Sequence, residues 1–210
     1  MKNMNMIVRD LGLCDWLKIN REMKDFTNQR DSNSIDELWF VEHFPVFTYG
    51  LLETKNYGSN IKGIPVLYAN RGGKITYHGP GQLVIYFLID LRRKKIKFYK
   101  FVKNSEILII KLLRELNILS HLNNLWPGIY VNKKKICSLG FRITRGCSLY
   151  GLSLNIKMDL TPFSYINPCG NKTIIMTQVD HFKKNVSMQK IKNIFIKNFC
   201  KLFNYLVTYD

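Results

Sequence analysis

The chain has 210 residues, of which 46% are hydrophobic and 13% are aromatic. This apolar content offsets the conformational entropy of ordering the chain and excludes a disordered protein, and the length favours one domain over residues 1–210. Lys and Arg number 32 against 15 Asp and Glu, a net charge of +17, which favours an acidic partner unless codon bias explains the abundant lysine.

Apolar runs are short throughout the chain. The run from Leu83 stops at Asp90, and the run from Ile107 stops at Lys111, so neither reaches the roughly 20 residues of a membrane span. Residues 1–10 contain no uninterrupted apolar segment and no small-residue cleavage site, which disfavours a secretory signal. We therefore expect no membrane span and a cytoplasmic location.

The N-terminal half predicts one helix and several strands. Between Leu13 and Phe26 apolar residues recur at spacings of three and four, so the chain is expected to open with an amphipathic helix. Residues 37–48 are rich in aromatic and β-branched residues and predict two strands separated by a kink at Pro45. A short strand at 65–68 and a strongly apolar one at 83–90 follow.

The C-terminal half predicts a buried helix, a hairpin and a final helix. Apolar residues on one broad face indicate the main buried helix at 105–119. Alternating patterns predict strands at 128–132, 135–143 and 149–156, and the last two form a hairpin through the turn at 144–146.

The final helix is expected to begin at Ser187, a plausible N-cap. Its inward-facing residues would be Ile191, Phe195, Phe199, Leu202 and Leu206. Because the strands pair locally rather than alternating regularly with helices, the order predicts a mixed α+β fold.

A glycine-rich segment at residues 71–82, RGGKITYHGPGQ, precedes the apolar strand. Four glycines and a proline let the backbone approach a ligand closely and present N–H groups to it. The same residues would also form a pair of ordinary tight turns. Arg71, Thr76, Tyr77 and His78 favour a binding segment, because a plain turn needs no such polar residues.

The five cysteines are Cys14, Cys137, Cys147, Cys169 and Cys200. Their odd number and irregular spacing, with no C-x-x-C pair, disfavour a disulfide framework and a zinc site. Cys169 is the best-placed nucleophile, because its Pro-Cys-Gly sequence fixes the backbone on one side, removes bulk on the other and exposes the sulfur. A small buried hydrophobe is the alternative for any free cysteine.

A second cluster, KICSLG, occupies residues 135–140. If it meets the Pro-Cys-Gly loop in space, Lys135 would place a positive charge beside Cys169, and a cation within about 4 to 6 Å favours a thiolate. A solvated strand end after Lys133 and Lys134 is the alternative. Sequence spacing leaves both interpretations open.

Three segments carry a resemblance to a known family. They are RGGKITYHGPGQL from residue 71, GIYVNKKKICSLGFRITRGCSLYGLSLNI from residue 128 and DLTPFSYINPCG from residue 159. In this order and spacing they resemble the bacterial octanoyltransferases, or lipoyl(octanoyl) transferases, and DELWFVEHFPVFTYG from residue 36 fits the same family. The similarity covers about residues 11–206. It implies the fold of the biotin and lipoate protein ligase catalytic domain, a mixed β-sheet flanked by helices.

The resemblance also implies a cytoplasmic enzyme of protein lipoylation and the roles of particular residues. The acylated nucleophile would be Cys169, and Lys135 would tune it. Three segments would line the acyl pocket: Arg71, Gly72, Gly73, Lys74, Ile75, Thr76, Tyr77 and His78; Ser138, Leu139 and Gly140; and Gly151, Leu152 and Ser153.

The chain departs from the family pattern at three positions. Tyr150 stands where His is common, Phe87 where Pro or a smaller apolar residue is common, and Asn70 where Asp is frequent. Tyr150 weakens any mechanism in which a histidine of that strand moves protons. His78 and His43 remain as candidates, each with a hydrogen-bonded structural histidine as the alternative.

The implied reaction has two steps. A thiolate of Cys169 attacks the thioester of octanoyl-acyl carrier protein, and the acyl-cysteine then passes its octanoyl or lipoyl group to a lysine of a lipoyl domain. Expected acceptors are the E2 subunits of 2-oxoacid dehydrogenases and the glycine cleavage H protein. Lys135 would stabilise the thiolate and accept the amine proton. Backbone N–H groups near Cys169 or at Gly79–Gly81 would stabilise the oxyanion, and no cofactor, neither ATP nor a metal, is expected.

Two other function classes compete with this interpretation. An ATP-dependent lipoate ligase shares the implied fold and a glycine-rich loop, but it needs an adenylate pocket and no acylated cysteine. A nucleic-acid-binding module rests on charge alone, without zinc spacing or an RNP-like motif, so no nucleic acid is expected. The basic run RRKKIK at residues 92–97 is interpreted as a docking surface for acidic carrier protein, with a solvated loop as the alternative.

Overall fold

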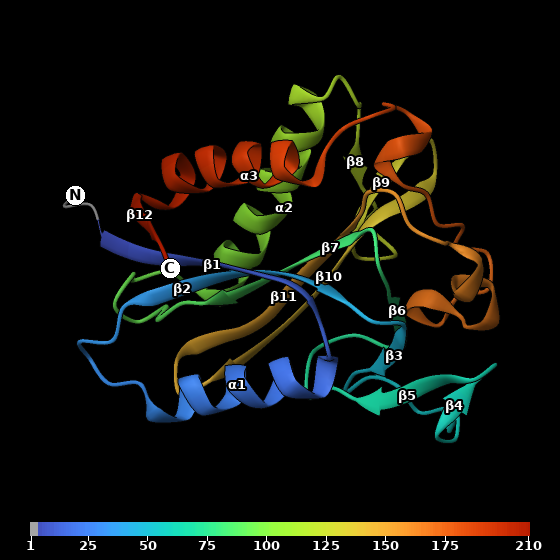
Figure 1. Cartoon of the computed structure of the whole chain (residues 1–210), viewed down its shortest axis with the longest axis horizontal. Coiled ribbons are helices and arrows are strands. Elements are labelled where there is room, and N and C mark those ends of the chain that lie inside the picture. The colour runs from blue at the N-terminus through green and yellow to red at the C-terminus, as the bar shows by residue number, and fades with distance from the viewer. Residues whose placement is uncertain (1–3) are drawn as a thin grey trace.

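Figure 1 shows the computed structural model of the chain, which describes residues 4–210. Positions 1–3 lie outside the described residues. The domain predicted over residues 1–210 and the N-terminal residues 1–10, in which no secretory signal is expected, both include these three positions. A large eight-stranded sheet forms the centre, and a smaller four-stranded sheet lies toward one end of it.

The large sheet has the strand order β12-β1-β2-β7-β11-β10-β9-β8. β1 is parallel to both of its neighbours, and every other adjacent pair in this sheet is antiparallel. The bounds are β1 Met4–Cys14, β2 Asp36–His43, β7 Gln82–Leu88, β8 His121–Leu122, β9 Ile129–Val131, β10 Lys134–Thr144, β11 Cys147–Asn155 and β12 Tyr205–Tyr209. All residues of β7 and β11 are buried, because helices cover both faces at the centre of the sheet.

The small sheet has the order β4-β5-β3-β6. Its strands are β3 Val46–Tyr49, β4 Asn60–Ile61, β5 Ile64–Tyr68 and β6 Thr76–His78. Three short 3-10 helices, η1 Thr161–Tyr165, η2 Pro168–Gly170 and η3 Val179–His181, belong to the segment between β11 and the last helix. Phe47 and Tyr77 pack with Phe163 of η1 in a separate small core, so the glycine-rich segment and the Pro-Cys-Gly loop are anchored to the same cluster.

Three α-helices cover the large sheet, α1 (Trp16–Gln29) on one face and α2 (Phe98–Glu115) and α3 (Met188–Phe203) on the other. Asp15 caps α1 by accepting the Lys18 N–H, and Ser187 caps α3 by accepting the Lys190 N–H. The N-cap predicted at Ser187 is confirmed. Within residues 4–210, no helix is long and apolar enough to cross a membrane.

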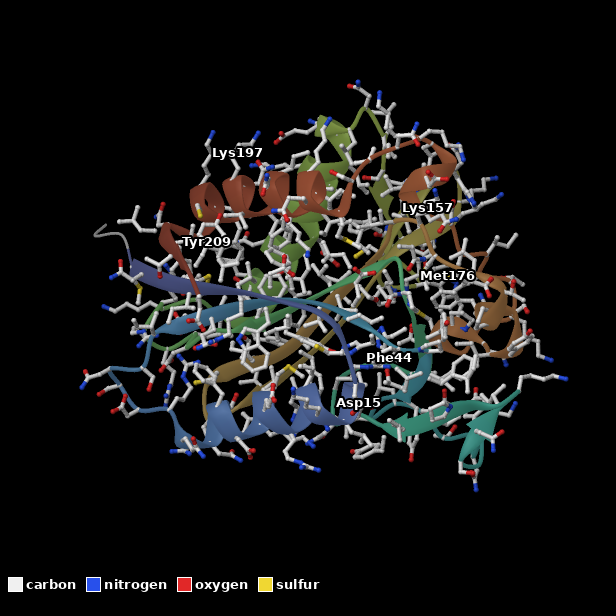
Figure 2. The ribbon with its side chains drawn as sticks, in the orientation of Figure 1. Asp15, Phe44, Lys157, Met176, Lys197 and Tyr209 are labelled. Carbon is white, nitrogen blue, oxygen red and sulfur yellow. The ribbon has the colours of Figure 1, made fainter. Side chains whose placement is uncertain are left out.

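Side chains fill the space between the large sheet and the helices (Figure 2). Phe87, at the centre of β7, is fully buried, and its ring lies within 6.0 Å, centroid to centroid, of four other phenylalanine rings. Such edge and tilted contacts add to the energy of burial. The larger residue at this position is therefore accommodated by aromatic packing, and the predicted mixed sheet flanked by helices is confirmed.

Some element predictions were wrong. The chain opens with strand β1 rather than with a helix, and β12 was not predicted; these two strands pair with each other at the edge of the sheet. Leu206 lies in β12 and is 55% exposed, because α3 ends at Phe203 and its C-cap, Asn204, has a left-handed φ of 54°. The second helix begins at Phe98, seven residues before the predicted start at 105, and ends at Glu115.

Candidate active site

Cys169 and Lys135 meet although 34 positions separate them in the sequence. The Lys135 Nζ lies 3.0 Å from the Cys169 Sγ and also donates to the carbonyl oxygen of Pro127 at 2.6 Å. Lys135 is buried, whereas Cys169 is partly exposed. A buried cation touching an accessible sulfur is the environment in which a thiolate becomes a nucleophile.

The backbone around both residues fixes this contact. The Lys135 N–H donates to the Ile175 carbonyl, and the Thr177 N–H donates to the Lys135 carbonyl, each at 2.8 Å. Met176, labelled in Figure 2, therefore pairs with β10 in a parallel bridge. This bridge ties the segment that follows Cys169 to the start of β10, and nothing in the sequence pattern indicated it.

Cys169 has a φ of 55°, in the left-handed region that residues with a side chain rarely adopt. Strain of this kind persists only where the surrounding contacts enforce it, and it is concentrated at functional sites. Gly170, which follows, also has a positive φ and lies against Lys74: a Cβ atom there would be 2.6 Å from the Lys74 Nζ. The positive φ therefore favours glycine in the Pro-Cys-Gly sequence, whereas the flexible Lys74 side chain could move away from a Cβ atom.

Gly128 is a site residue that the sequence analysis missed. Its φ is 143°, and a Cβ atom built on it would lie 2.4 Å from the Lys135 Cε and 2.8 Å from the Cys137 carbonyl oxygen. Only glycine leaves room for the lysine side chain to reach Cys169. The available signal was the Pro-Gly pair just before a predicted strand, which also fits an ordinary turn.

Cys169 and Lys135 line a cavity together with most of the residues predicted for the acyl pocket. The predicted residues that line it are Arg71, Gly73, Lys74, Ile75, Thr76, His78, Ser138, Leu139, Gly140, Gly151, Leu152 and Ser153. The residues that were not predicted are Trp16, Val84, Tyr86, Tyr150 and Pro168. Val84 and Tyr86 alternate along β7, so the period of a strand could have assigned them to one face.

Two predicted pocket residues do not line the cavity. Tyr77 points into the core of the small sheet, where its ring packs against Phe47 and Phe163. Gly72 donates its N–H to the Phe141 carbonyl at 3.0 Å. Both predictions are corrected. Tyr77 lies in β6 between Thr76 and His78, which line the cavity, so the alternation of a strand turns its side chain to the other face. Gly72 faces β10 through its backbone.

Arg71 organises the glycine-rich segment from inside. Its guanidinium donates to the carbonyl oxygens of Gly72, Lys74 and Thr48, and to the Thr48 hydroxyl at 2.9 Å. Burial lowers the pKa of Arg71 to about 10, so the side chain keeps its charge at neutral pH. The charge is satisfied mainly by backbone carbonyls, which bend the loop around it.

His78 belongs to a chain of hydrogen bonds with Thr48, Gln82 and Asn155. The Gln82 Nε2 donates to the Asn155 Oδ1, so the Gln82 Oε1 accepts from the His78 Nδ1 at 2.7 Å. The His78 Nε2 then accepts from the Thr48 hydroxyl at 3.2 Å; this tautomer is assigned from the bonding network. Burial lowers the pKa of His78 to about 3, so the ring is neutral.

His43 is similarly engaged. Its Nδ1 donates to the Cys14 carbonyl at 3.1 Å, and its Nε2 accepts from the Tyr86 hydroxyl at 2.8 Å. Burial lowers the pKa of His43 to about 4. These bonds favour the structural alternative for both histidines, because each ring nitrogen already has a partner and that partner is not Cys169.

Three of the other thiols, those of Cys137, Cys147 and Cys200, have surroundings that differ from those of Cys169. Burial raises the pKa of Cys137 to about 12 and raises the pKa values of Cys147 and Cys200, so these thiols stay protonated. Within residues 4–210, no three His, Cys, Asp or Glu side chains lie close enough to hold a metal ion. The expectation of a metal-independent protein stays a prediction.

The two predicted sources of oxyanion donors differ in position. Residues 79–81 do not line the cavity, and the Gly81 N–H donates to the Glu42 carboxylate at 2.7 Å. The alternative at Gly79–Gly81 is therefore wrong. Donors near Cys169 stay a prediction, and among them the Gly170 N–H is bonded to the Asn167 carbonyl at 2.8 Å.

The basic run at 92–97 lies away from this site. Arg92 packs against Gly146 in the β10–β11 turn, whereas Lys135 is at the other end of β10, about 30 Å along the strand. Arg92 pairs with Asp90. Arg93 pairs with Asp36, and the Lys94 Nζ donates to the Phe203 carbonyl. Residues 92–97 therefore do not line the cavity, and their role as a docking surface for acidic carrier protein stays a prediction.

Comparisons with known proteins agree with this geometry. The family model of the lipoyl protein ligase A/B catalytic domain matches residues 19–200. An octanoyltransferase of Buchnera aphidicola subsp. Schizaphis graminum (strain Sg) is 46% identical over 208 residues, which cover 97% of this chain and 95% of that protein.

Two solved structures share the fold. A lipoate-protein ligase A bound with ATP superposes with a TM-score of 0.77 at 15% identity, covering 100% of this chain and 90% of that one. The biotin protein ligase from Aquifex aeolicus in complex with biotin and ATP gives a TM-score of 0.57 at 11% identity, covering 95% and 70%. The family itself follows from the sequence relative and the family model: this chain belongs to the octanoyltransferases, a family of acyltransferases.

Proposed function

We propose that this enzyme transfers an octanoyl or lipoyl group from acyl carrier protein to a lysine of a lipoyl domain, through a thioester on Cys169. The observation that carries the proposal is the 3.0 Å contact between the Cys169 Sγ and the Lys135 Nζ at a cavity that also has apolar walls. A thiol held against a buried cation suits covalent catalysis. The cavity supplies a place for an apolar chain.

In the first step the Cys169 thiolate attacks the carbonyl carbon of the octanoyl thioester. A new carbon–sulfur bond forms, the bond to the carrier sulfur breaks, and the departing carrier thiolate takes a proton from the Lys135 ammonium. One thioester replaces another, so the step needs no ATP. Acylation removes the negative charge that faces Lys135, so the thioester needs no ammonium beside it.

In the second step the acceptor amine attacks the acyl-cysteine. The carbon–nitrogen bond of the amide forms, the bond to Cys169 breaks, and the now neutral Lys135 amine takes the proton that the acceptor nitrogen loses. This restores the starting thiolate and ammonium. His78 and His43 are not needed in either step, consistent with their closed hydrogen bonds.

The fold alone is compatible with an ATP-dependent lipoate ligase, since one such structure superposes on the whole chain. Ligase chemistry, however, needs no acylated thiol, and the contact between Cys169 and Lys135 has no purpose in it. The transferase is therefore the better-supported function. We place it in the cytoplasm and in the endogenous lipoylation route, with the E2 subunits of 2-oxoacid dehydrogenases and the glycine cleavage H protein as acceptors.

Mass spectrometry tests this proposal directly. Protein incubated with octanoyl-acyl carrier protein, without ATP or metal, should gain one octanoyl group on Cys169 that hydroxylamine removes and a lipoyl domain discharges. Cys169→Ala should stay unmodified, and Cys147→Ala, which changes a buried thiol, should load normally. An adduct that persists in Cys169→Ala, or transfer that requires ATP, would contradict the proposal.

A further inference from the structure

A second cavity, of about 180 Å³, adjoins the acyl cavity between α1 and the β10–β11 hairpin. Its walls include Lys24 and Thr27 of α1, Arg142 and Thr144 of β10, and Leu149 of β11. Tyr150 lines both cavities and is the one residue that their walls share within the described part of the chain. Tyr150 therefore lies at the boundary between the two cavities.

The strand register shows which end of the acyl cavity Tyr150 occupies. In the antiparallel β10–β11 ladder, Ser138 pairs with Ser153, whereas Phe141 pairs with Tyr150. Lys135, which contacts Cys169, comes before Ser138 on β10. The cavity walls therefore run along the ladder from Cys169 and Ser153 at one end to Tyr150 at the other.

Tyr150 is fixed in position rather than free to move aside. It is 3% exposed, its hydroxyl donates to the Asn20 Oδ1 at 2.9 Å, and its ring packs edge-on against Tyr86 at 6.4 Å between centroids. Its φ of 60° lies in the left-handed region, which is a rare conformation for an aromatic residue in a strand. Surrounding contacts must enforce such a backbone.

We propose that Tyr150 sets the upper limit on acyl-chain length by closing the end of the acyl cavity that lies away from Cys169. The proposal rests on the proposed function, in which the chain attached to Cys169 occupies this cavity. A fully buried ring with a bonded hydroxyl is a rigid wall, so a longer chain would have to displace it and break its bond to Asn20.

Beyond the ring, the second cavity offers the space that a longer chain needs. Leu149 and the aliphatic stem of the exposed Lys24 contribute apolar wall, while the Lys24 ammonium can turn toward water. Loss of the Tyr150 ring would join the two cavities. The variant would then accept chains that the wild-type protein rejects.

The test compares loading of Cys169 from octanoyl-, decanoyl- and dodecanoyl-acyl carrier protein, followed by mass spectrometry and expressed as ratios of kcat/KM. Tyr150→Gly removes the ring and suits the positive φ. Its dodecanoyl-to-octanoyl ratio should rise at least about tenfold, the scale on which an apolar pocket discriminates small differences in length. Tyr150→Leu, which shortens the side chain but keeps it apolar, should raise the ratio less.

Two control variants separate the ring from its surroundings. Tyr150→Phe keeps the ring but loses the bond to Asn20, so its ratio should rise less than that of Tyr150→Leu. Thr144→Ala enlarges the second cavity without changing Tyr150 and should keep the wild-type ratio. Circular dichroism and thermal unfolding establish that each variant is folded, and Tyr150→Leu decides the matter if Tyr150→Gly does not fold.

Unchanged ratios in folded Tyr150→Gly and Tyr150→Leu that still accept octanoyl groups would overturn the role of Tyr150 and leave the proposed function intact. Equal loading of wild type with octanoyl and dodecanoyl groups would also overturn it, since no limit would exist. A wild-type protein that takes no octanoyl group from acyl carrier protein would overturn the proposed function itself, and this inference with it.

Discussion

The two ends of β10 each carry buried positive charge, and they use it differently. At one end Lys135 faces the Cys169 sulfur and a backbone carbonyl. Near the other end Arg30 and Arg93 both bond to the buried carboxylate of Asp36, each at 2.6 Å. A cation neutralised by a carboxylate stabilises structure, whereas one that faces a thiol can stabilise a reactive anion. The difference in partner, rather than in burial, distinguishes the end that we propose to be catalytic (the catalytic end) from the structural end.

The largest effect is expected from Lys135→Ala. Octanoyl transfer should fall by about 10² to 10⁴, because the variant loses both thiolate stabilisation and proton transfer. The pH at which iodoacetamide alkylates Cys169 should rise as well. Lys135→Arg should keep the alkylation profile but transfer slowly, since arginine does not accept a proton at neutral pH.

Lys134→Ala is the matched control for that comparison. Lys134 is the preceding residue on β10 and is exposed, so its loss should leave both the alkylation profile and the transfer rate near wild type. An unchanged alkylation profile in Lys135→Ala would show that the lysine and the thiol do not couple, and the contrast between the two ends of β10 would fail.

Asp36→Ala should affect stability rather than chemistry. It removes the shared partner of Arg30 and Arg93 and the acceptor of the Tyr205 hydroxyl. Leaving a buried arginine uncompensated costs about 3 to 5 kcal/mol of unfolding free energy, measurable by urea denaturation.

The fraction of Asp36→Ala that remains folded should still load Cys169 at the wild-type rate. Asp180→Ala is the control, because it breaks an exposed ion pair with Lys184 and should leave stability nearly unchanged. A large loss of intrinsic loading rate with unchanged stability would contradict the structural role assigned to this end.

Gly128→Ala tests whether the absence of a side chain at residue 128 is what allows the Lys135 side chain to reach Cys169. The new methyl group would collide with the Lys135 Cε, and a displacement of about 1 Å in a catalytic group costs on the order of 100-fold in rate. Transfer should therefore drop by about that factor, with a shift of the alkylation profile in the same direction as in Lys135→Ala.

Gly12→Ala is the matched control, since Gly12 also has a positive φ, but a Cβ atom built on it would meet no atom within 4 Å. It should show the cost of backbone strain without loss of transfer. If both glycine variants lose activity equally, the effect comes from strain and not from the position of Lys135.

The sequence predicted the separate elements around this site better than the contacts between them. Local patterns and the family resemblance predicted the hairpin, the cap at Ser187 and the Pro-Cys-Gly loop. The contact between Lys135 and Cys169 depends on the pairing of Met176 with β10, a long-range hydrogen-bonded bridge that leaves no periodic trace.

The errors have the same physical origin. The strand β1 carries charged residues and a glycine, and its assignment depends on pairing with β2 and β12. The run at 92–97 looked like free charge because its partners, among them Asp36 and the Phe203 carbonyl, are distant in the sequence. The local sequence shows where charged side chains occur. Tertiary contacts determine which of these side chains are already bonded within the protein and which remain free to bind another molecule.

The smallest effect concerns pH, and it arises from His78 and His43 near the catalytic end. Burial lowers the pKa of His78 to about 3 and that of His43 to about 4. Below an ordinary histidine pKa of about 6.5 the unfolded chain binds protons that the folded protein excludes, so unfolding free energy is full above that pH and falls as the pH drops toward 4. Each histidine should account for about 1 to 2 kcal/mol of the loss between pH 7 and pH 5.

In His78→Gln this loss, measured by urea denaturation at several pH values, should shrink by the share of one histidine. His121→Gln, which changes an exposed residue of β8, should keep the wild-type slope. If His78→Gln also keeps that slope, His78 titrates alike in the folded and unfolded states, and the neutral hydrogen-bonded ring that the structure assigns to it would be wrong.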